Sequence, residues 1–168
     1  HTGTPIRPEL YAGRRAQGLS FLGFTGQKPV LLIMGGSLGA QAVNDAVRGA
    51  LARLVQTYDI VHLCGKKKVD EALLCVPGYR QFEFVGKELP DVLAATDLVI
   101  SRAGANAVFE FLALAKPALL VPLPLEASRG DQILNAKYFA RKGFSMLLEQ
   151  EKLTPAALIC AVGELDLN

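Results

Sequence analysis

The feature that most constrains the fold is an apolar run that ends in a cluster of glycines. Residues 30–34 read Val-Leu-Leu-Ile-Met and lead directly into Gly35, Gly36, Ser37, Leu38 and Gly39. Five consecutive apolar residues bounded by turn residues are typical of a strand buried on both faces, as in a parallel sheet. The glycines allow a sharp turn and a close approach to a ligand, and we expect Ser37 to cap the following helix. The free N–H groups of such a helix favour an anion, phosphate above all.

This glycine loop does not identify a ligand by itself. The spacing of Gly35, Gly36 and Gly39 differs from the dinucleotide pattern G-x-G-x-x-G, and no Gly-Lys-Ser/Thr of a P-loop follows. A plain strand-to-helix turn, with glycines for close packing, is therefore the alternative interpretation of this loop.

Strand and helix patterns alternate from residue 29 to the end of the chain. The expected strands are residues 30–34, 59–64, 81–85, 97–101, 118–121 and 144–148; the expected helices are residues 38–56, 66–75, 89–95, 105–115, 131–142 and 155–162, after a short helix within 8–16. Thr154 is the expected N-cap of the last helix and Gly163 its end, and Gly143 is the expected end of the helix before it. Such alternation predicts an α/β, Rossmann-like fold, with a parallel sheet of about six strands and helices on both faces.

Length and composition narrow the class of protein. A chain of 168 residues favours one domain, and a formal net charge of +2 gives no argument for nucleic acid. The spacing of Cys64, Cys75 and Cys160 suggests neither a disulfide framework nor a zinc site, which fits a reducing cytoplasm. No apolar run has the length of a membrane span. Because the sequence does not begin with Met, we expect a soluble piece of a longer protein.

A second glycine junction follows the expected strand 97–101. Residues 101–106 read Ser-Arg-Ala-Gly-Ala-Asn and again lead from a strand into a helix. In a parallel sheet both junctions lie at the carboxyl edge, where ligands bind at a topological switch point. Two helix N-termini facing one crevice suit a diphosphate. Glu110, expected in about the first turn of this helix, either complements the helix dipole or accepts hydrogen bonds from the 2′ and 3′ hydroxyls of a ribose.

Two further loops carry candidate polar residues. The long loop 122–130 leads into Asp131, Gln132 and Asn135, which can read sugar hydroxyls or can simply form a capped, solvated helix start. Gln132 and Asn135 are three residues apart and share a helix face. His62 lies near the end of its expected strand, where a structural role is favoured over proton transfer.

Four motifs taken together resemble the C-terminal half of the MurG family of N-acetylglucosaminyltransferases. In chain order they are Gly-Thr-Pro-Ile-Arg at 3–7, Gly-Gly-Ser-Leu-Gly-Ala at 35–40, Ser-Arg-Ala-Gly-Ala-Asn at 101–106 with Glu110, and Asp-Gln-Ile-Leu-Asn-Ala at 131–136. The resemblance implies that residues 1–168 form a single UDP-sugar (donor) binding domain of a GT-B glycosyltransferase, whose N-terminal acceptor domain is absent. It implies an inverting enzyme that needs no metal or cofactor. This enzyme moves N-acetylglucosamine from UDP-N-acetylglucosamine to lipid I and so produces lipid II. The implied role is peptidoglycan synthesis, on which cell shape and cell division depend.

The resemblance also implies a role for each matching site residue. Arg7 lies near the donor, Ser37 contacts the phosphates, the backbone of Val85 reads the uracil, and Glu110 binds the ribose. The remaining implied contacts are the phosphate loop Gly35, Gly36 and Gly39, the phosphate and sugar loop Gly104, Ala105 and Asn106, and the sugar-facing residues Asp131, Gln132 and Asn135. The chain departs from some relatives at Asp131, where they have Gln, and at Ala107, where they have Thr.

No catalytic residue stands out in the chain. An inverting transfer needs a base to deprotonate the acceptor hydroxyl, and the resemblance implies that the base, the lipid I pocket and the peripheral contact with the cytoplasmic face of the bacterial membrane belong mainly to the missing domain. We therefore expect the fragment alone to be inactive or poorly active. Two alternatives stay open: the donor domain of another GT-B sugar-nucleotide enzyme (a lipid glycosyltransferase or an epimerase), and a non-catalytic nucleotide-binding module that needs a second chain.

Overall fold

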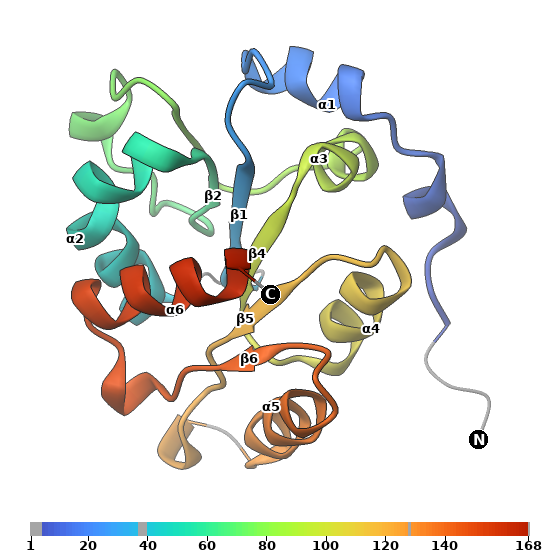
Figure 1. Ribbon diagram of the computed structural model, residues 1–168, viewed down its shortest axis with the longest axis vertical. Helices are drawn as coiled ribbons and strands as arrows, with labels where there is room; N and C mark the ends of the chain where they lie inside the picture. The colour runs from blue at the N-terminus through green and yellow to red at the C-terminus, as the bar shows by residue number, and fades with distance from the viewer. Residues whose placement is uncertain (1–4, 37–39, 128, 168) are drawn as a thin grey trace.

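The centre of the molecule is a six-stranded sheet in which every strand pairing is parallel. The computed structural model describes residues 5–36, 40–127 and 129–167. The strands are β1 (Val30–Met34), β2 (Asp59–Leu63), β3 (Tyr79–Phe82), β4 (Leu98–Ser101), β5 (Ala118–Leu120) and β6 (Met146–Leu147), in the order β3-β2-β1-β4-β5-β6 (Figure 1). The order reverses between β1 and β4, which makes the ends of these two strands the topological switch point. The predicted fold class is confirmed.

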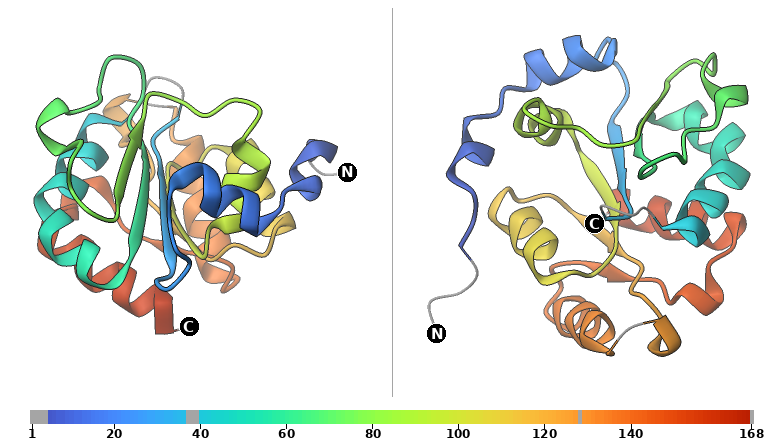
Figure 2. Two further views of the ribbon diagram at one scale, coloured as in Figure 1. Left: turned by 90° about the horizontal axis from the view of Figure 1, so that it is seen from above. Right: turned by 180° about the vertical axis from the view of Figure 1, so that it is seen from behind.

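Helices cover both faces of this sheet. They are α1 (Arg15–Leu22), α2 (Gln41–Thr57), α3 (Leu89–Ala95), α4 (Ala105–Ala113), α5 (Asp131–Arg141) and α6 (Pro155–Leu167), with short 3₁₀ turns η1 (Pro8–Ala12), η2 (Glu71–Leu73), η3 (Leu125–Ala127) and η4 (Gln150–Lys152). α2 and α6 pack on one face, and α1, α3, α4 and α5 on the other (Figures 1 and 2). In β1, Leu31 and Ile33 join the first of these cores while Val30 and Leu32 join the second. The apolar run therefore lies between two helix layers, as its sequence predicts.

The prediction of a helix at residues 66–75 is wrong. Only the short turn η2 forms there, because tertiary contacts use the backbone that a helix would need. Lys67 has a φ of 57°, which is incompatible with a right-handed helix. The N–H of Asp70 donates to Gln81 Oε1 and its carbonyl accepts from Gln81 Nε2, at 3.1 and 2.9 Å. The Gln81 side chain thus replaces the helical partners of this segment.

Several boundaries also differ from expectation. The third strand is Tyr79–Phe82 rather than 81–85, because the buried ring of Tyr79 brings the segment beside Ile60 two residues earlier. The helix expected within 8–16 is instead η1 followed by α1. α2 begins at Gln41, with Ala40 at the N-cap, rather than at residue 38, and Ser37, the expected cap of this helix, lies outside the described residues.

The last helix continues past its expected end. Gly163 lies inside α6 rather than beyond it, since the buried side chain of Leu165 and a 2.9 Å hydrogen bond from Tyr58 Oη to Asp166 Oδ2 hold the final turn on the core. Two end signals are confirmed: Thr154 Oγ1 accepts from the N–H of Ala157, and Gly143 has a φ of 74° just after α5.

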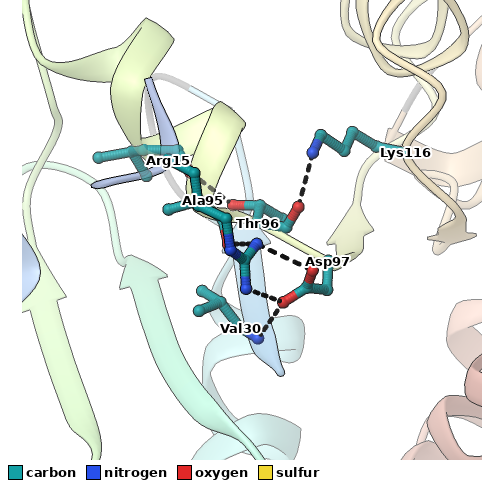
Figure 3. A network of polar contacts seen from close by, with 7 residues as sticks. Arg15, Val30, Ala95, Thr96, Asp97 and Lys116 are labelled. Atoms are coloured by element: carbon teal, nitrogen blue, oxygen red, sulfur yellow. Dashed lines mark hydrogen bonds and ion pairs between the residues drawn. The ribbon is translucent and has the colours of Figure 1, made fainter. Parts of the chain in front are cut away.

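A polar network closes the amino edge of the sheet. Asp97, directly before β4, accepts hydrogen bonds from both terminal nitrogens of Arg15 at 3.0 and 3.1 Å and from the N–H of Val30 at 2.8 Å (Figure 3). Lys116 donates to the carbonyl of Thr96 at 2.7 Å. The network ties α1 to the starts of β1 and β4, at the edge opposite the glycine loops.

Candidate functional site

The two glycine junctions meet at the carboxyl edge of the sheet. β1 and β4 are neighbours, with Met34 beside Ser101, so the residues that follow the two strands lie next to one another. They border a cavity of about 390 Å³. Its lining comes from both junctions and from the segments after β5, and consists of Met34, Gly35, Gly36, Ala40, Ser101, Arg102, Gly104, Ala107, Leu123 and Gln132.

Two helix starts border this cavity. α2 and α4 pack on opposite faces of the sheet, but both begin at its carboxyl edge, where Ala40 and Gly104 occupy their N-caps and line the cavity. Neither N-cap makes a side-chain hydrogen bond to its helix. Helix N-termini without such caps present N–H groups that suit an anion. Of the predicted phosphate loop, Gly35 and Gly36 line the cavity, whereas Ser37 and Gly39 lie outside the described residues.

Glu110 and Arg7 are brought together across the molecule. Glu110 lies in the second turn of α4 rather than the first, and its Oε1 and Oε2 accept from Nε and Nη2 of Arg7 at 2.9 and 3.2 Å. The Arg7 side chain is 49% exposed and that of Glu110 is 14% exposed. The hydrogen bond with Glu110 is the main cause that raises the pKa of Arg7. Both oxygens predicted to bind a diol are therefore held by a half-exposed cation.

The amide side chains of α5 join neighbouring loops at the same edge. Gln132 Oε1 accepts from the N–H of Leu123 at 3.1 Å, and Asn135 Nδ2 donates to the carbonyl of Ala103 at 3.1 Å. Gln132 also lines the cavity, and Asp131 is an exposed residue in the first turn of α5. The shared helix face predicted for Gln132 and Asn135 thus contacts the loops after β5 and β4.

The other predicted contacts, Val85, Ala105 and Asn106, do not line the cavity. Val85 lies in the loop after β3, beyond the end of that strand, and packs against the core on the α3 and α4 side. Ala105 and Asn106 are exposed in the first turn of α4.

Arg102 is a cavity-lining residue to which the sequence reasoning gave no role. It is 8% exposed and follows β4 directly. Its Nη1 donates to the carbonyls of Val121 and Pro122 at 3.0 and 3.2 Å, and its Nη2 to Gln150 Oε1 at 2.7 Å. The available signal was its position, because a cation placed immediately after a buried strand of a parallel sheet lies at the carboxyl edge.

His62 has the structural role that its sequence context favours. Its Nε2 lies 2.8 Å from Asn44 Oδ1 and its Nδ1 lies 2.8 Å from Tyr79 Oη. Because Asn44 Nδ2 donates to the carbonyl of Cys64, its oxygen faces the imidazole, which places the proton on Nε2. Burial, with a smaller contribution from Arg48, lowers the pKa of His62 to about 3, so the ring is neutral at physiological pH.

The described ranges contain neither a cluster of metal ligands nor a helix suited to spanning a membrane. Across residues 5–36, 40–127 and 129–167, no group of three or more His, Cys, Asp or Glu side chains is arranged to hold a metal ion. Within the same ranges, no helix has the length and apolarity needed to cross a membrane.

Comparison with known proteins assigns the family. Residues 30–168 match the model of the glycosyltransferase family 28 C-terminal domain. The chain belongs to this family. The chain is 57% identical over all 168 residues to the Bacillus cereus protein named UDP-N-acetylglucosamine–N-acetylmuramyl-(pentapeptide) pyrophosphoryl-undecaprenol N-acetylglucosamine transferase 2, and covers 48% of that protein. It is 52% identical over 167 residues to the corresponding transferase of Clostridium kluyveri, covering 99% of this chain and 47% of that one.

A solved relative supports the same assignment for this family 28 chain. The crystal structure of Acinetobacter baumannii MurG superposes on the whole chain with a TM-score of 0.75 at 29% identity, and the chain covers 48% of it. The chain thus spans about half the length of the relatives that it matches. The resemblance to MurG read from the four motifs is confirmed.

Proposed function

We propose that this chain is the donor-binding domain of an N-acetylglucosaminyltransferase, which binds UDP-N-acetylglucosamine and, in the whole enzyme, delivers its sugar to lipid I to form lipid II. The observation that carries the proposal is the cavity at the switch point. It lies between two uncapped helix starts, in a chain 57% identical throughout to a protein named for this transfer.

The donor diphosphate is proposed to lie between the starts of α2 and α4. Charge builds on the diphosphate as the glycosidic bond breaks, and backbone N–H groups and cations that already point there stabilise it without rearranging. Gly35 and Gly36 allow the backbone to approach closely, Gly36 with a φ of 87° and open space around it. The proposal therefore needs neither a metal nor a cofactor.

The remaining donor contacts are proposed from the resemblance to the MurG family. Val85 is proposed to present its backbone to the uracil, and Glu110 to accept the two ribose hydroxyls after Arg7 is displaced toward the phosphates. Ala105 and Asn106 lie at the start of α4, beside the proposed phosphates and sugar. Gln132, Asn135 and Asp131 are proposed to face the sugar from the start of α5.

The acceptor half of the reaction is proposed to lie on the part of the enzyme that this chain does not include. The general base, the lipid I pocket and the peripheral contact with the cytoplasmic face of the bacterial membrane are assigned to that part. This chain then binds the donor but transfers its sugar poorly or not at all.

Calorimetric titration of the 168-residue chain tests the donor assignment. We expect UDP-N-acetylglucosamine to bind more tightly than UDP-glucose, and dTDP-sugars to bind weakly. A preference for another sugar nucleotide would favour the donor domain of a different GT-B enzyme, such as a lipid glycosyltransferase or an epimerase. Absence of binding by any uridine nucleotide would refute the proposal.

A transfer assay tests the division of labour. Lipid I and labelled UDP-N-acetylglucosamine are incubated with this chain alone, and then with a separately produced N-terminal half from a relative. We expect lipid II only from the mixture. Robust transfer by the chain alone would refute the assignment of the base to the missing part, and binding without transfer in the mixture would favour a non-catalytic nucleotide-binding module.

A further inference from the structure

Arg102 is a buried cation whose neighbours carry no full negative charge. Its three acceptors are the carbonyls of Val121 and Pro122 and the amide oxygen of Gln150. Its Nε is buried and has no hydrogen-bond partner. Within the described parts of the chain, no carboxylate lies at ion-pair distance from it. The guanidinium is therefore partly hydrogen-bonded but electrically uncompensated.

Such an arrangement costs folding free energy. A buried charge is stable when it is paired and fully hydrogen-bonded, and arginine does not escape the cost by losing its proton. Burial is the single cause acting on the pKa of Arg102, which it lowers, and no charged neighbour opposes that shift. A buried, unpaired positive charge next to a cavity is therefore expected to be balanced by the negative charge of a ligand.

The cavity beside Arg102 offers the place for that counter-charge. Arg102, Gly36 and Gly104 all line it, and so do the residues at the N-caps of α2 and α4. We propose that Arg102 is the buried counter-ion of the donor diphosphate, so that it makes this site select a nucleoside diphosphate over the uncharged nucleoside. The inference rests on the proposed function, since it needs a uridine diphosphate in this cavity.

The hydrogen bonds of Arg102 also place the segment that closes the cavity. Val121 and Pro122 end β5 and begin the loop to α5, and the next residue, Leu123, lines the cavity and is held by Gln132. A purely structural role for Arg102 in holding this loop would affect every ligand of the site equally. A charge role affects ligands in proportion to their negative charge, which separates the two.

Binding of UDP, UMP and uridine to the 168-residue chain and three variants tests the inference by calorimetry. Arg102→Gln removes the charge and keeps a donor for the carbonyls, and Arg102→Lys keeps the charge. Arg80→Gln is the matched control, because Arg80 is a half-buried arginine at the start of β3 that donates to the carbonyls of Leu22 and Tyr79.

We expect Arg102→Gln to weaken UDP binding by about tenfold to a hundredfold, UMP less, and uridine by less than about twofold. Arg102→Lys should keep the ratio of UDP to uridine affinity within about threefold of the parent, and Arg80→Gln should leave all three affinities unchanged. Equal losses for UDP and uridine, or an unchanged UDP affinity, would overturn the inference.

The remaining outcomes are also decisive. If circular dichroism shows that Arg102→Gln is unfolded, Arg102→Lys decides, and a collapsed UDP-to-uridine ratio in that folded variant overturns the charge role. If the parent chain binds no uridine ligand, the proposed function fails together with this inference. If the parent binds UDP and the ratio is insensitive to Arg102, only this inference fails.

Discussion

At the amino edge of the sheet, the carboxylate of Asp97 is bound by the guanidinium of Arg15 and by a backbone N–H of β1 (Figure 3). At the carboxyl edge, the guanidinium of Arg102 is more deeply buried, and its acceptors among the described residues are three neutral oxygens. The amino edge fastens α1 to the sheet with matched charges. The carboxyl edge keeps an unmatched charge and two uncapped helix starts beside a cavity.

This contrast separates charges that stabilise the fold from a charge that we propose binds a ligand. A carboxylate that accepts from a guanidinium and also from a part-buried backbone N–H stabilises the chain by itself, whereas an unmatched buried cation reduces stability until an anion binds. Burial alone does not make this distinction, because His62 is buried even more deeply than Arg102. His62 meets the cost by staying neutral between two hydrogen-bond partners, an option that arginine lacks.

The largest expected effect comes from breaking the amino edge. Asp97→Ala leaves Arg15 and the N–H of Val30 without their shared acceptor, and we expect the free energy of unfolding to fall by about 3 kcal/mol, because hydrogen bonds to charged groups are the strong ones. Urea unfolding measures the loss. UDP affinity should stay within about twofold.

Arg53→Ala is the control for this variant, since Arg53 is exposed and its guanidinium donates to Gln56 Oε1 on its own helix. Its effect on the free energy of unfolding should stay within about 0.5 kcal/mol. If Asp97→Ala weakened UDP binding as much as Arg102→Gln does, the division between a structural edge and a ligand edge would not hold.

The second effect is a loss of stability in acid that depends on His62. Its pKa is about 3 in the folded chain and about 6.5 when unfolded, so the unfolded chain binds the extra proton first. The free energy of unfolding therefore falls as the pH drops below about 6.5, and this contribution stops changing below about 3. Between pH 7 and pH 5 the expected loss is about 2 kcal/mol.

Urea unfolding of the parent and of His62→Gln at pH 7 and pH 5 measures this term. Carboxylates contribute to the pH dependence of both proteins, so the difference between the two slopes isolates the imidazole. His62→Gln should be less stable at pH 7, because Gln does not reproduce both ring contacts, but it should lose about 2 kcal/mol less on acidification. Identical slopes would contradict a neutral, buried His62.

Local pattern was sufficient to predict the parallel sheet. The mainly apolar strands β1, β4 and β5, each followed by a turn or loop and then a helix, match the pattern of strands buried on both faces. The prediction of a helix at residues 66–75 was wrong because the helical pattern there competes with tertiary contacts, chiefly the hydrogen bonds between the Gln81 side chain and the backbone of Asp70. The predicted end of α6 was wrong for the same reason, since the hydrogen bond from Tyr58 to Asp166 keeps the last turn of the helix on the core. Local propensity does not contain such contacts.

The candidate site was predictable in its loops but not in its charge balance. Glycine spacing after two strands places both junctions at one edge, which the cavity between Gly36 and Gly104 bears out. That Arg7 reaches Glu110 across more than a hundred residues is invisible to spacing. The lack of a charged partner for Arg102 among the described residues is likewise a property of the packed structure, since a sequence shows a cation but not what surrounds it.

A smaller effect is expected at the diol. Glu110→Gln keeps the shape of the side chain and removes its charge, and we expect the affinity for UDP and for uridine to fall by roughly tenfold each, because both ligands carry the ribose. Calorimetry measures both, with the exposed Glu71→Gln as the control. This pattern is the opposite of that for Arg102→Gln, which spares uridine. A variant that kept full UDP affinity would remove the ribose assignment.

The smallest expected effect comes from Arg7, which sharpens the comparison within the carboxyl edge. Its side chain is half exposed, so solvent screens its pair with Glu110 and Arg7→Gln should lower the free energy of unfolding by less than about 1 kcal/mol. The same variant releases the Glu110 carboxylate for its proposed ribose contact and removes the cation proposed to move toward the phosphates. We therefore expect uridine affinity to hold or rise and UDP affinity to fall by about threefold, with the loss vanishing in 0.5 M salt.

The loss for Arg102→Gln should persist in that salt, because a buried charge is screened much less. Equal salt dependence for the two arginines would show that burial does not set their contributions apart.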